Sequence, residues 1–299
     1  MSKCINQSTS IFSLIIILLA GLMIMPGCKD EDPEIYDFSA VSEDFMQTYV
    51  TCIHLFFYVD GMAKSVEDSL SVHPEGSYLL NGGTVTVDPA VPGEYPKTFL
   101  VDFGTTGKDD IIAGKITGAI NESYISEGST VVYEYEDLTI HNDRPAGSNQ
   151  ITNMGLSSGN ILFNFQVSES TFIRNFEADS AYPVTFSGFH QVLWSESDNQ
   201  ITMPSGTFTG QSMRADSLKF QAVVDESYKL IKEEDCTYIR DGMFDFTVSL
   251  SRDDEKVGEG IVDFGFMNPV DCDQYVIAVI DGEVSRTEFI YLMDWVNFK

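Results

Sequence analysis

Residues 95–120 read "YPKTFLVDFGTTGKDDIIAGKITGAI" and contain two segments that a short acidic loop separates. The first segment ends in Val101-Asp102-Phe103-Gly104, and the loop "TTGKDD" leads into the second. In the second segment the residues of one face alternate with the polar residues Lys115 and Thr117; that face holds Ile112, Gly114, Ile116, Gly118 and Ile120. A period of two is typical of a β-strand with one buried face. The stretch therefore predicts strand, turn, acidic loop and strand.

The same unit occurs a second time. Residues 262–265 are again Val-Asp-Phe-Gly, and they lead through "FMNPVDCDQ" into the apolar segment "YVIAVIDGEV". Self-similarity of this kind indicates an internal repeat. A Gly/Ser-rich stretch at residues 155–159 separates the copies, and such stretches are typical of linkers. We therefore predict a first β domain at residues 73–157 and a second at residues 158–299.

Further segments alternate in the same way, namely "ILFNFQV" (161–167), "LKFQAVV" (218–224) and "FDFTVSL" (244–250). Strands of this length between Gly, Asn, Asp and Ser clusters favour antiparallel sheets. Helix-length patterns between the strands are absent, which disfavours a parallel α/β sheet. The predicted class is mainly β, with antiparallel β-sandwich domains that contain a duplicated unit.

One helix is expected before the strands, at residues 41–72. Its clearest part is "SEDFMQTYVTCIHLFFYV" (42–59), where an apolar stripe recurs at spacings of three and four; the stripe holds Phe45, Tyr49, Cys52, Ile53, Phe56 and Val59. Ser42 followed by Glu43 and Asp44 makes a suitable helix start. Such a stripe predicts a helix that packs against the core.

The N-terminus has the pattern of a secretion signal. Residues 11–25, "IFSLIIILLAGLMIM", form an apolar run, and Lys3 precedes it. The run is short for a membrane span, which needs about 20 residues, and it matches the apolar part of a signal peptide. We predict a signal peptide at residues 1–27; an uncleaved N-terminal anchor is the alternative.

Met25-Pro26-Gly27-Cys28 ends this run and resembles the lipobox of bacterial lipoproteins. The resemblance implies cleavage before Cys28 and attachment of acyl chains such as palmitate, which together anchor a protein stably. The following Lys29, Asp30, Glu31 and Asp32 are similar to the surface-export signal of Bacteroidetes lipoproteins; a plain solvated tether is the alternative. Residues 28–40 form the expected tether, of which 29–40 reach at most about 40 Å.

The remaining cysteines suggest one disulfide. Cys236 and Cys272 flank an expected hairpin and form the candidate pair, because export places them in a compartment that permits disulfides. Cys52 lies on the apolar face of the helix and is expected to be a buried free thiol. No cysteine spacing suggests a zinc or redox site.

A family resemblance extends over most of residues 95–290. The segments quoted for residues 95–120, "GSTVVYEYEDLTIHNDRPAGSNQITNMG" (128–155) and "CTYIRDGMFDFTV" (236–248) resemble a family of Bacteroidetes lipoproteins. Thr105 and Thr106 stand where that family often has a cysteine. The resemblance implies a fold and a location in the cell envelope, and it implies no activity.

The charge of the chain disfavours two classes of partner. The chain has 299 residues with 17 basic and 46 acidic ones, a net charge of −29, and loss of Lys3 with the signal peptide would leave −30. A chain this acidic repels nucleic acid and anionic lipid headgroups. The expected partners are therefore the membrane through the lipid, and a surface glycan or envelope protein.

The acidic residues do not form a recognisable catalytic or metal motif. Asp102 and Asp263 share one local context, so we expect each to cap a turn rather than to form a catalytic pair. The acidic segments 108–110, 252–255 and 271–274 lack the spacing of a calcium loop, and no cofactor motif is present. Trp194 and Trp295 are expected to pack in or beside a sheet rather than to stack on sugars.

The sequence also lacks histidine and nucleophile motifs of known metal-binding or catalytic chemistry. The histidines at positions 54, 73, 141 and 190 show no metal-binding spacing, and no nucleophile motif is present. Three Asp-Ser-aliphatic triplets, which begin at Asp68, Asp179 and Asp216, look like the O-glycosylation motif of this bacterial group. We expect a non-enzymatic lipoprotein of the outer membrane that faces the surface and has a binding or structural role. The alternatives are a fimbrial subunit or adhesin and a glycan-processing enzyme.

Overall fold

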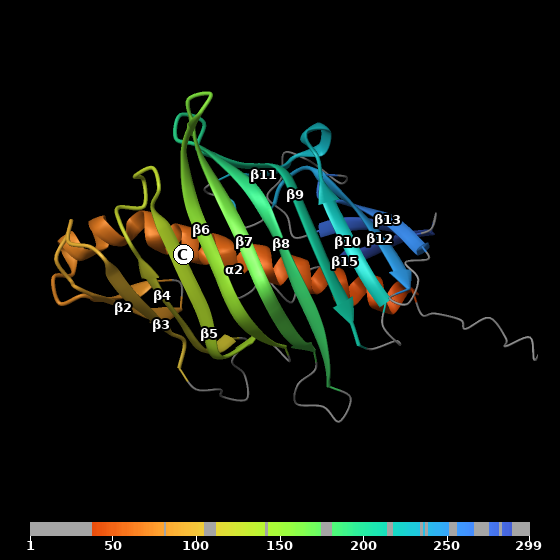
Figure 1. Cartoon of the computed structure of the whole chain (residues 1–299), viewed down its shortest axis with the longest axis horizontal. Helices are drawn as coiled ribbons and strands as arrows, with labels where there is room; N and C mark the ends of the chain where they lie inside the picture. Colours follow the sequence, from red (N-terminus) through yellow and green to blue (C-terminus); the bar gives the residue numbers. More distant parts are fainter. Residues whose placement is uncertain are drawn as a thin grey trace, which may run out of the picture. The chain divides into compact units, whose positions relative to one another are not determined.

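One long helix and fifteen strands make up most of the described chain (Figure 1). The structure is a computed structural model and describes residues 38–80, 82–104, 112–140, 143–174, 181–213, 218–233, 236, 239–250, 256–265, 275–280 and 283–288. All of them belong to one compact unit, Asp37–Lys299. The predicted class is confirmed, because the protein is mainly β, with a large antiparallel sheet and a single helix near the N-terminus.

The helix is α2 (Phe38–Val72), and a 3-10 turn, η1, covers Glu226–Tyr228. The strands, in chain order, are β1 (Ser77–Leu80), β2 (Gly83–Asp88), β3 (Lys97–Asp102), β4 (Ile112–Ile120), β5 (Thr130–Ile140), β6 (Arg144–Ser157), β7 (Asn160–Arg174), β8 (Tyr182–Ser195), β9 (Gln200–Ser212), β10 (Leu218–Val224), β11 (Leu230–Glu233), β12 (Met243–Leu250), β13 (Lys256–Asp263), β14 (Tyr275–Ile280) and β15 (Glu283–Glu288).

The strands form one sheet in which neighbours in sequence are neighbours in space. The order runs from β1 to β10 and then through β12, β13 and β14 to β15, and neighbouring strands in the described part of the chain are antiparallel. β9 has two partners on one side, because residues 206–212 pair with β10 and residues 200–203 pair with β11. A meander of this kind needs only short connections between strands.

The two predicted repeat units are two hairpins of this sheet. β3 pairs with β4, and β13 pairs with β14. After β3 the Asp102 carboxylate accepts a hydrogen bond from the Gly104 amide at 2.8 Å, and after β13 the Asp263 carboxylate accepts one from the Gly265 amide at 2.9 Å. The prediction that both aspartates cap a turn is confirmed.

The predicted boundary between two β domains lies inside the sheet. Residues 155–159 include the tip of the β6–β7 hairpin, where Ser157 pairs with Asn160. Strands on both sides of this tip belong to the same sheet and to the same compact unit. The duplication therefore gives two hairpins of one sheet and not two separate β domains, and the Gly/Ser stretch serves as a turn.

Helix α2 begins earlier than expected and ends as expected. It starts at Phe38 and not at Ser42, and the residues between them, which include Ala40, are compatible with a helix. At the other end the His73 amide donates to the Ser69 carbonyl at 2.8 Å. Pro74 follows, and because a residue before proline avoids helical backbone angles, the helix stops at Val72.

The helix is buried on every side over part of its length. The six residues of the predicted stripe are at most 1% exposed. The residues between them are buried as well, so that Thr48 to Phe56 form nine consecutive buried positions. Nine residues of an α-helix cover all directions around its axis. The helix is therefore a central core element, rather than a helix with one buried face.

The sheet curves around this helix. Phe45 contacts strands up to β12 through Phe244 and Phe246, whereas the Tyr58 hydroxyl donates to the Leu80 carbonyl of β1 at 2.8 Å. These two helix residues lie only about 20 Å apart along the axis. In a flat sheet β1 and β12 would lie about 48 Å apart, at about 4.8 Å for each strand. The sheet must therefore bend, and Figure 1 shows α2 running behind the strands β6 to β8.

An aromatic cluster joins the first part of α2 to the sheet. The ring centroid of Phe45 lies 4.1 Å from that of Phe220, and the ring of Tyr49 lies 4.7 Å from Phe244 and 5.4 Å from Phe208. All five rings are at most 2% exposed. Aromatic pairs at these distances add to the free energy gained from burial.

A buried lysine holds the connection between β2 and β3. Lys97 is 0% exposed, and its Nζ donates to the Val91 carbonyl at 2.7 Å and lies 3.7 Å from the Glu67 carboxylate. Glu67 also accepts hydrogen bonds from the Gly93 amide and the Tyr95 hydroxyl, both at 2.6 Å. A buried ammonium group needs such partners, because it has lost its contact with water. The cluster ties the loop to the last turns of α2.

We predict that Lys97→Met lowers the free energy of unfolding by about 2 kcal/mol, because hydrogen bonds from a charged donor are each worth about 1.5–3 kcal/mol. Urea unfolding followed by circular dichroism measures the change. Lys229→Met, at an exposed position, is the matched control and should change stability by less than about 0.5 kcal/mol. Equal losses in both variants would show that the cluster contributes nothing specific.

Candidate ligand-binding face

Strands β6 to β9 contain few charged residues, although the chain as a whole is highly charged. Of the 56 residues in these four strands, three are charged, whereas charged residues make up 21% of the chain. Arg144 and Arg174 lie at strand ends, where they form ion pairs with Asp137 and Asp143. Glu169 lies at a register shift in β7. Apart from these three, the residues of β6 to β9 are uncharged.

The side chains that point away from α2 on these strands form one surface, which we call the neutral face. They alternate along each strand with buried residues such as Phe163, Phe165 and His190. The neutral face consists of Ser148, Gln150, Thr152, Met154, Leu162, Asn164, Gln166, Ser168, Ser187, Phe189, Gln191, Ser205 and Thr207. It offers amides and hydroxyls, which both donate and accept hydrogen bonds, beside a few apolar groups.

Strand register arranges these side chains in rows across the sheet. Gln150 lies opposite Gln166, Gln166 opposite Phe189, and Phe189 opposite Thr207. Directly opposed side chains of an antiparallel pair lie about 5 Å apart. The next row runs from Thr152 through Asn164 and Gln191 to Ser205 in the same way.

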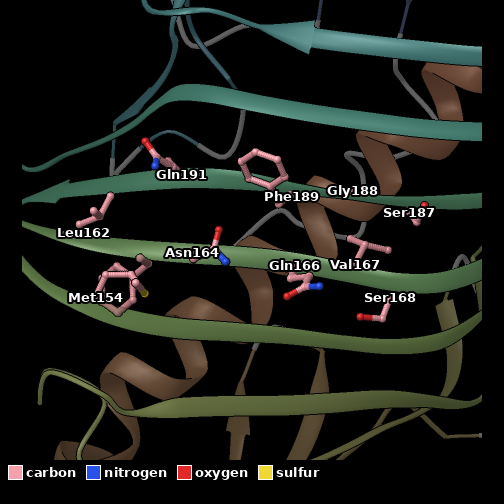
Figure 2. Close-up of a pocket in the computed structure, with 11 residues that line it drawn as sticks. Met154, Leu162, Asn164, Gln166, Val167, Ser168, Ser187, Gly188, Phe189 and Gln191 are labelled. Atoms are coloured by element: carbon pink, nitrogen blue, oxygen red, sulfur yellow. The ribbon is translucent and has the colours of Figure 1, made fainter.

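The neutral face contains a hollow of about 810 Å³ over β6, β7 and β8. Figure 2 shows its amide side chains, those of Asn164, Gln166 and Gln191, on the face of the sheet away from the helix, with the Phe189 ring beside them. Phe189 is 43% exposed and Met154 is 54% exposed. Within the described residues the amides of Asn164 and Gln166 form no hydrogen bond to the protein. These two amides are therefore available to a ligand.

Irregular strand pairing accounts for the hollow. The register shifts between Asn153 and Leu156 in β6 and between Val167 and Ser170 in β7. Such bulges bend a sheet locally and turn side chains in new directions. Gly188 lies opposite Val167 at the second shift, and a Cβ atom there would come within 2.3 Å of the Thr207 carbonyl oxygen. Only glycine permits this close approach of β8 and β9.

Below Phe189 a buried histidine connects the strands to the helix. The Tyr49 hydroxyl lies 2.7 Å from His190 Nε2, and His190 Nδ1 lies 3.3 Å from the Ser205 carbonyl oxygen. Because a carbonyl can only accept, the Nδ1 atom carries the proton and Nε2 accepts from Tyr49. Gly206 makes room for the ring, since a Cβ there would lie 2.0 Å from Nδ1. The neighbour of Phe189 thus fixes β8, β9 and α2 to one another.

Burial keeps the core histidines neutral. It lowers the pKa of His190 to about 4, and it lowers the pKa of His54 to about 4 with a smaller contribution from the positive charge of Lys232. Both ring nitrogens of His54 are buried without a hydrogen-bond partner in the described part of the chain. Burial likewise raises the pKa of Tyr49, so the phenol remains a hydrogen-bond donor. These groups support the fold and do not reach the hollow.

Most of the predicted site residues lie outside the described residues. This holds for Cys28, Lys29, Asp30, Glu31 and Asp32, for Cys272, for Trp295 and for the three acidic segments. Cys236 is buried and disulfide-bonded, and its pairing with Cys272 stays a prediction. No helix in the described ranges is long and apolar enough to span a membrane. The described residues also include no group of three or more potential metal ligands.

The other predicted positions have structural roles. Cys52 is a buried free thiol, as predicted. Trp194 lies in the sheet, as part of β8 and in line with the prediction, and the Lys64 Nζ atom is 4.5 Å from the centroid of its ring. Lys64 in turn pairs with the buried Asp60, which accepts a hydrogen bond of 2.5 Å from Tyr124. The ring of Trp194 is thus covered by the protein's own cation.

Sequence reasoning missed the neutral face. The signal is present in the sequence, because residues 145–168, 181–195 and 199–213 contain no Asp, Glu, Lys or Arg. It becomes visible only when charge is counted strand by strand. No protein-family model, curated protein or solved structure matches the chain, so the functional argument rests on the geometry and chemistry of this face.

Proposed function

We propose that the protein is a lipid-anchored cell-envelope protein that binds an uncharged, hydroxyl-rich ligand, namely a surface glycan, on the neutral face. The observation that carries the proposal is the set of uncharged side chains that make up the neutral face, in a chain of net charge −29. Glycan hydroxyls both donate and accept hydrogen bonds, as the amides and hydroxyls of this face do. The exposed ring of Phe189 offers an apolar surface on which the C–H face of a sugar ring can stack.

Charge on the neighbouring strands supports the choice of this face. Glu134 and Glu136 of β5 are exposed on one side of it, and Asp245 of β12 and Glu259 of β13 are exposed on the other. A charged group needs a counterpart when a ligand displaces its water, whereas amides and hydroxyls need only hydrogen-bond partners. The ligand that fits between these charged margins is neutral.

The chemistry of the hollow favours binding without catalysis. The eleven lining residues are Met154, Leu162, Phe163, Asn164, Gln166, Val167, Ser168, Ser187, Gly188, Phe189 and Gln191. None of these described residues has a side chain that titrates near neutral pH, so no general acid or base faces a ligand there.

The lipid anchor is the other part of the proposal, and the lipobox-like Met25 to Cys28 supports it. Cells fed an alkyne analogue of palmitate should label the wild-type protein, and Cys28→Ser should abolish the label. A wild-type protein that takes up no label would contradict the anchor. Cleavage of the protein by a protease added to intact cells would support its export to the surface.

Affinity electrophoresis of the full-length protein in detergent tests the binding function. The wild-type protein should be retarded by at least one neutral polysaccharide, such as dextran, laminarin or a mannan, and not by alginate or heparin. Phe189→Ala should weaken the retardation about tenfold or more, a loss of about 1.4 kcal/mol. Ile261→Ala is the matched control, because Ile261 is 42% exposed on β13, and it should behave as the wild type. Retardation by the acidic polymers alone would contradict the proposal.

A further inference from the structure

A second hollow adjoins the first. It has a volume of about 680 Å³ and is bordered by side chains of β7, β8, β9, β10 and β12. Ser187 borders both hollows. The two depressions therefore share a wall on β8 and lie along one path across the sheet.

The second hollow differs in chemistry from the first. Its lining is rich in hydroxyls, contributed by Thr171, Thr185, Ser187, Thr209, Thr247 and Ser249. Gln211 and Gln221 add two amides, and Lys219 on β10 is the one charged residue among the described side chains of its lining. Most of this surface again suits a neutral ligand that carries many hydroxyls.

The floor of the second hollow is held in place by the core. Phe186 and Phe220 border it and are at most 2% exposed, and both contact the helix residue Phe45. Gly210 lets the Phe220 ring pack across β9 on the core side, because a Cβ there would lie 2.2 Å from the Phe220 ring and 2.2 Å from the Thr185 carbonyl oxygen. The surface is thus formed before any ligand arrives, which lowers the entropy cost of binding.

We propose that the two hollows form one groove and that its ligand is an extended, neutral polysaccharide chain rather than a single sugar. The proposal rests on the proposed glycan-binding function and adds the length of the ligand. From β6 to β12 the path crosses five strand spacings, or roughly 24 Å at about 4.8 Å each. One sugar ring fills only part of this path, so several units of one chain are needed to occupy both hollows.

The test varies the length of the oligosaccharide ligand. Isothermal titration of the full-length protein in detergent would use cello-, laminari- and malto-oligosaccharides of increasing length. The affinity of the wild-type protein for the series it recognises should rise at least about tenfold from the shortest member to one that reaches both hollows, which corresponds to about 1.4 kcal/mol.

One substitution distinguishes the contributions of the two hollows to binding. Thr209→Tyr places a large side chain in the second hollow, and tyrosine is well tolerated in strands. The variant should bind the shortest oligosaccharide as the wild type does, and its affinity should no longer rise with length. Thr86→Tyr, at an exposed position of β2, is the matched control and should retain the length dependence.

The other outcomes are distinguishable. Wild-type binding that does not depend on length, or an equal loss at every length in Thr209→Tyr, overturns the groove and leaves the binding function in place. No binding of any oligosaccharide or polysaccharide overturns both proposals. A wild-type dimer in light scattering that Thr209→Tyr and Phe189→Ala dissociate would show that the face binds a second copy of the chain, which also overturns both.

Discussion

Phe45→Ala should lower the free energy of unfolding by about 3–5 kcal/mol, the usual cost of removing a fully buried phenylalanine ring. The ring is 0% exposed and lies between the helix and three strands, through Phe186 of β8, Phe220 of β10 and Phe244 of β12. Its removal leaves a cavity that rigid aromatic neighbours cannot close. The loss should appear as a lower midpoint of urea unfolding.

Leu79→Ala is the control for this variant. Leu79 is also a large apolar residue, but it is 81% exposed on β1, so its truncation should change stability by less than about 0.5 kcal/mol. The packing of Phe45 against the sheet is contradicted if Phe45→Ala costs no more than Leu79→Ala. A helix that does not pack against these strands would give that result.

Mild acid should destabilise the protein through His54 and His190. Both have a pKa of about 4 in the folded protein, compared with about 6.5 in an unfolded chain. Between these values the unfolded chain binds more protons, so stability rises with pH. The contribution is fully present above about pH 6.5 and is lost as the pH falls toward 4, by about 3 kcal/mol for each histidine.

The experiment compares urea unfolding at pH 7 and pH 5.5, which stays above the isoelectric point of about 4.1. Each histidine should account for about 1 kcal/mol of the decrease at pH 5.5. His54→Leu should remove the part of the decrease at pH 5.5 that His54 causes. The variant should also be more stable than the wild type at pH 7, because it lacks the two buried ring nitrogens without hydrogen-bond partners.

His73→Leu is the control, since this histidine lies near the exposed Glu75 at the end of the helix, and it should keep the full pH dependence. If His54→Leu shows the same decrease between pH 7 and pH 5.5 as the wild type, His54 is not buried in its neutral form. The contribution of His190 would then need a separate measurement.

Local sequence patterns predicted the elements better than their arrangement. The period of two identified the strands, and the two Val-Asp-Phe-Gly segments identified two hairpins in which Asp102 and Asp263 play the same role. The pattern of three and four identified α2 and its buried stripe. These predictions succeeded because each depends on residues close together in the chain.

The enclosed helix was missed for a physical reason. Thr48, Thr51 and His54 are polar, and a periodicity argument places polar residues toward water. All three are at most 2% exposed, because the sheet and helix together bury even these positions. Such burial depends on strands far away in the sequence, which a local pattern does not report.

The neutral face was missed for a related reason. Alternation shows that Gln166 and Phe189 point away from the core, but it does not show that they are direct neighbours on adjacent strands. Register, bulges and the shared wall at Ser187 bring these side chains into one groove. The Gly/Ser-rich residues 155–159 were predicted as a linker for the same reason, because their composition suits both a linker and a hairpin turn.

Oxidative footprinting tests the proposed glycan binding most directly, because Met154 and Met213 are both 54% exposed and of the two only Met154 borders the hollow of the neutral face. The neutral polysaccharide that retards the wild-type protein should slow the oxidation of Met154 severalfold and leave that of Met213 unchanged. Equal oxidation of Met154 with and without the polysaccharide would contradict binding at the neutral face.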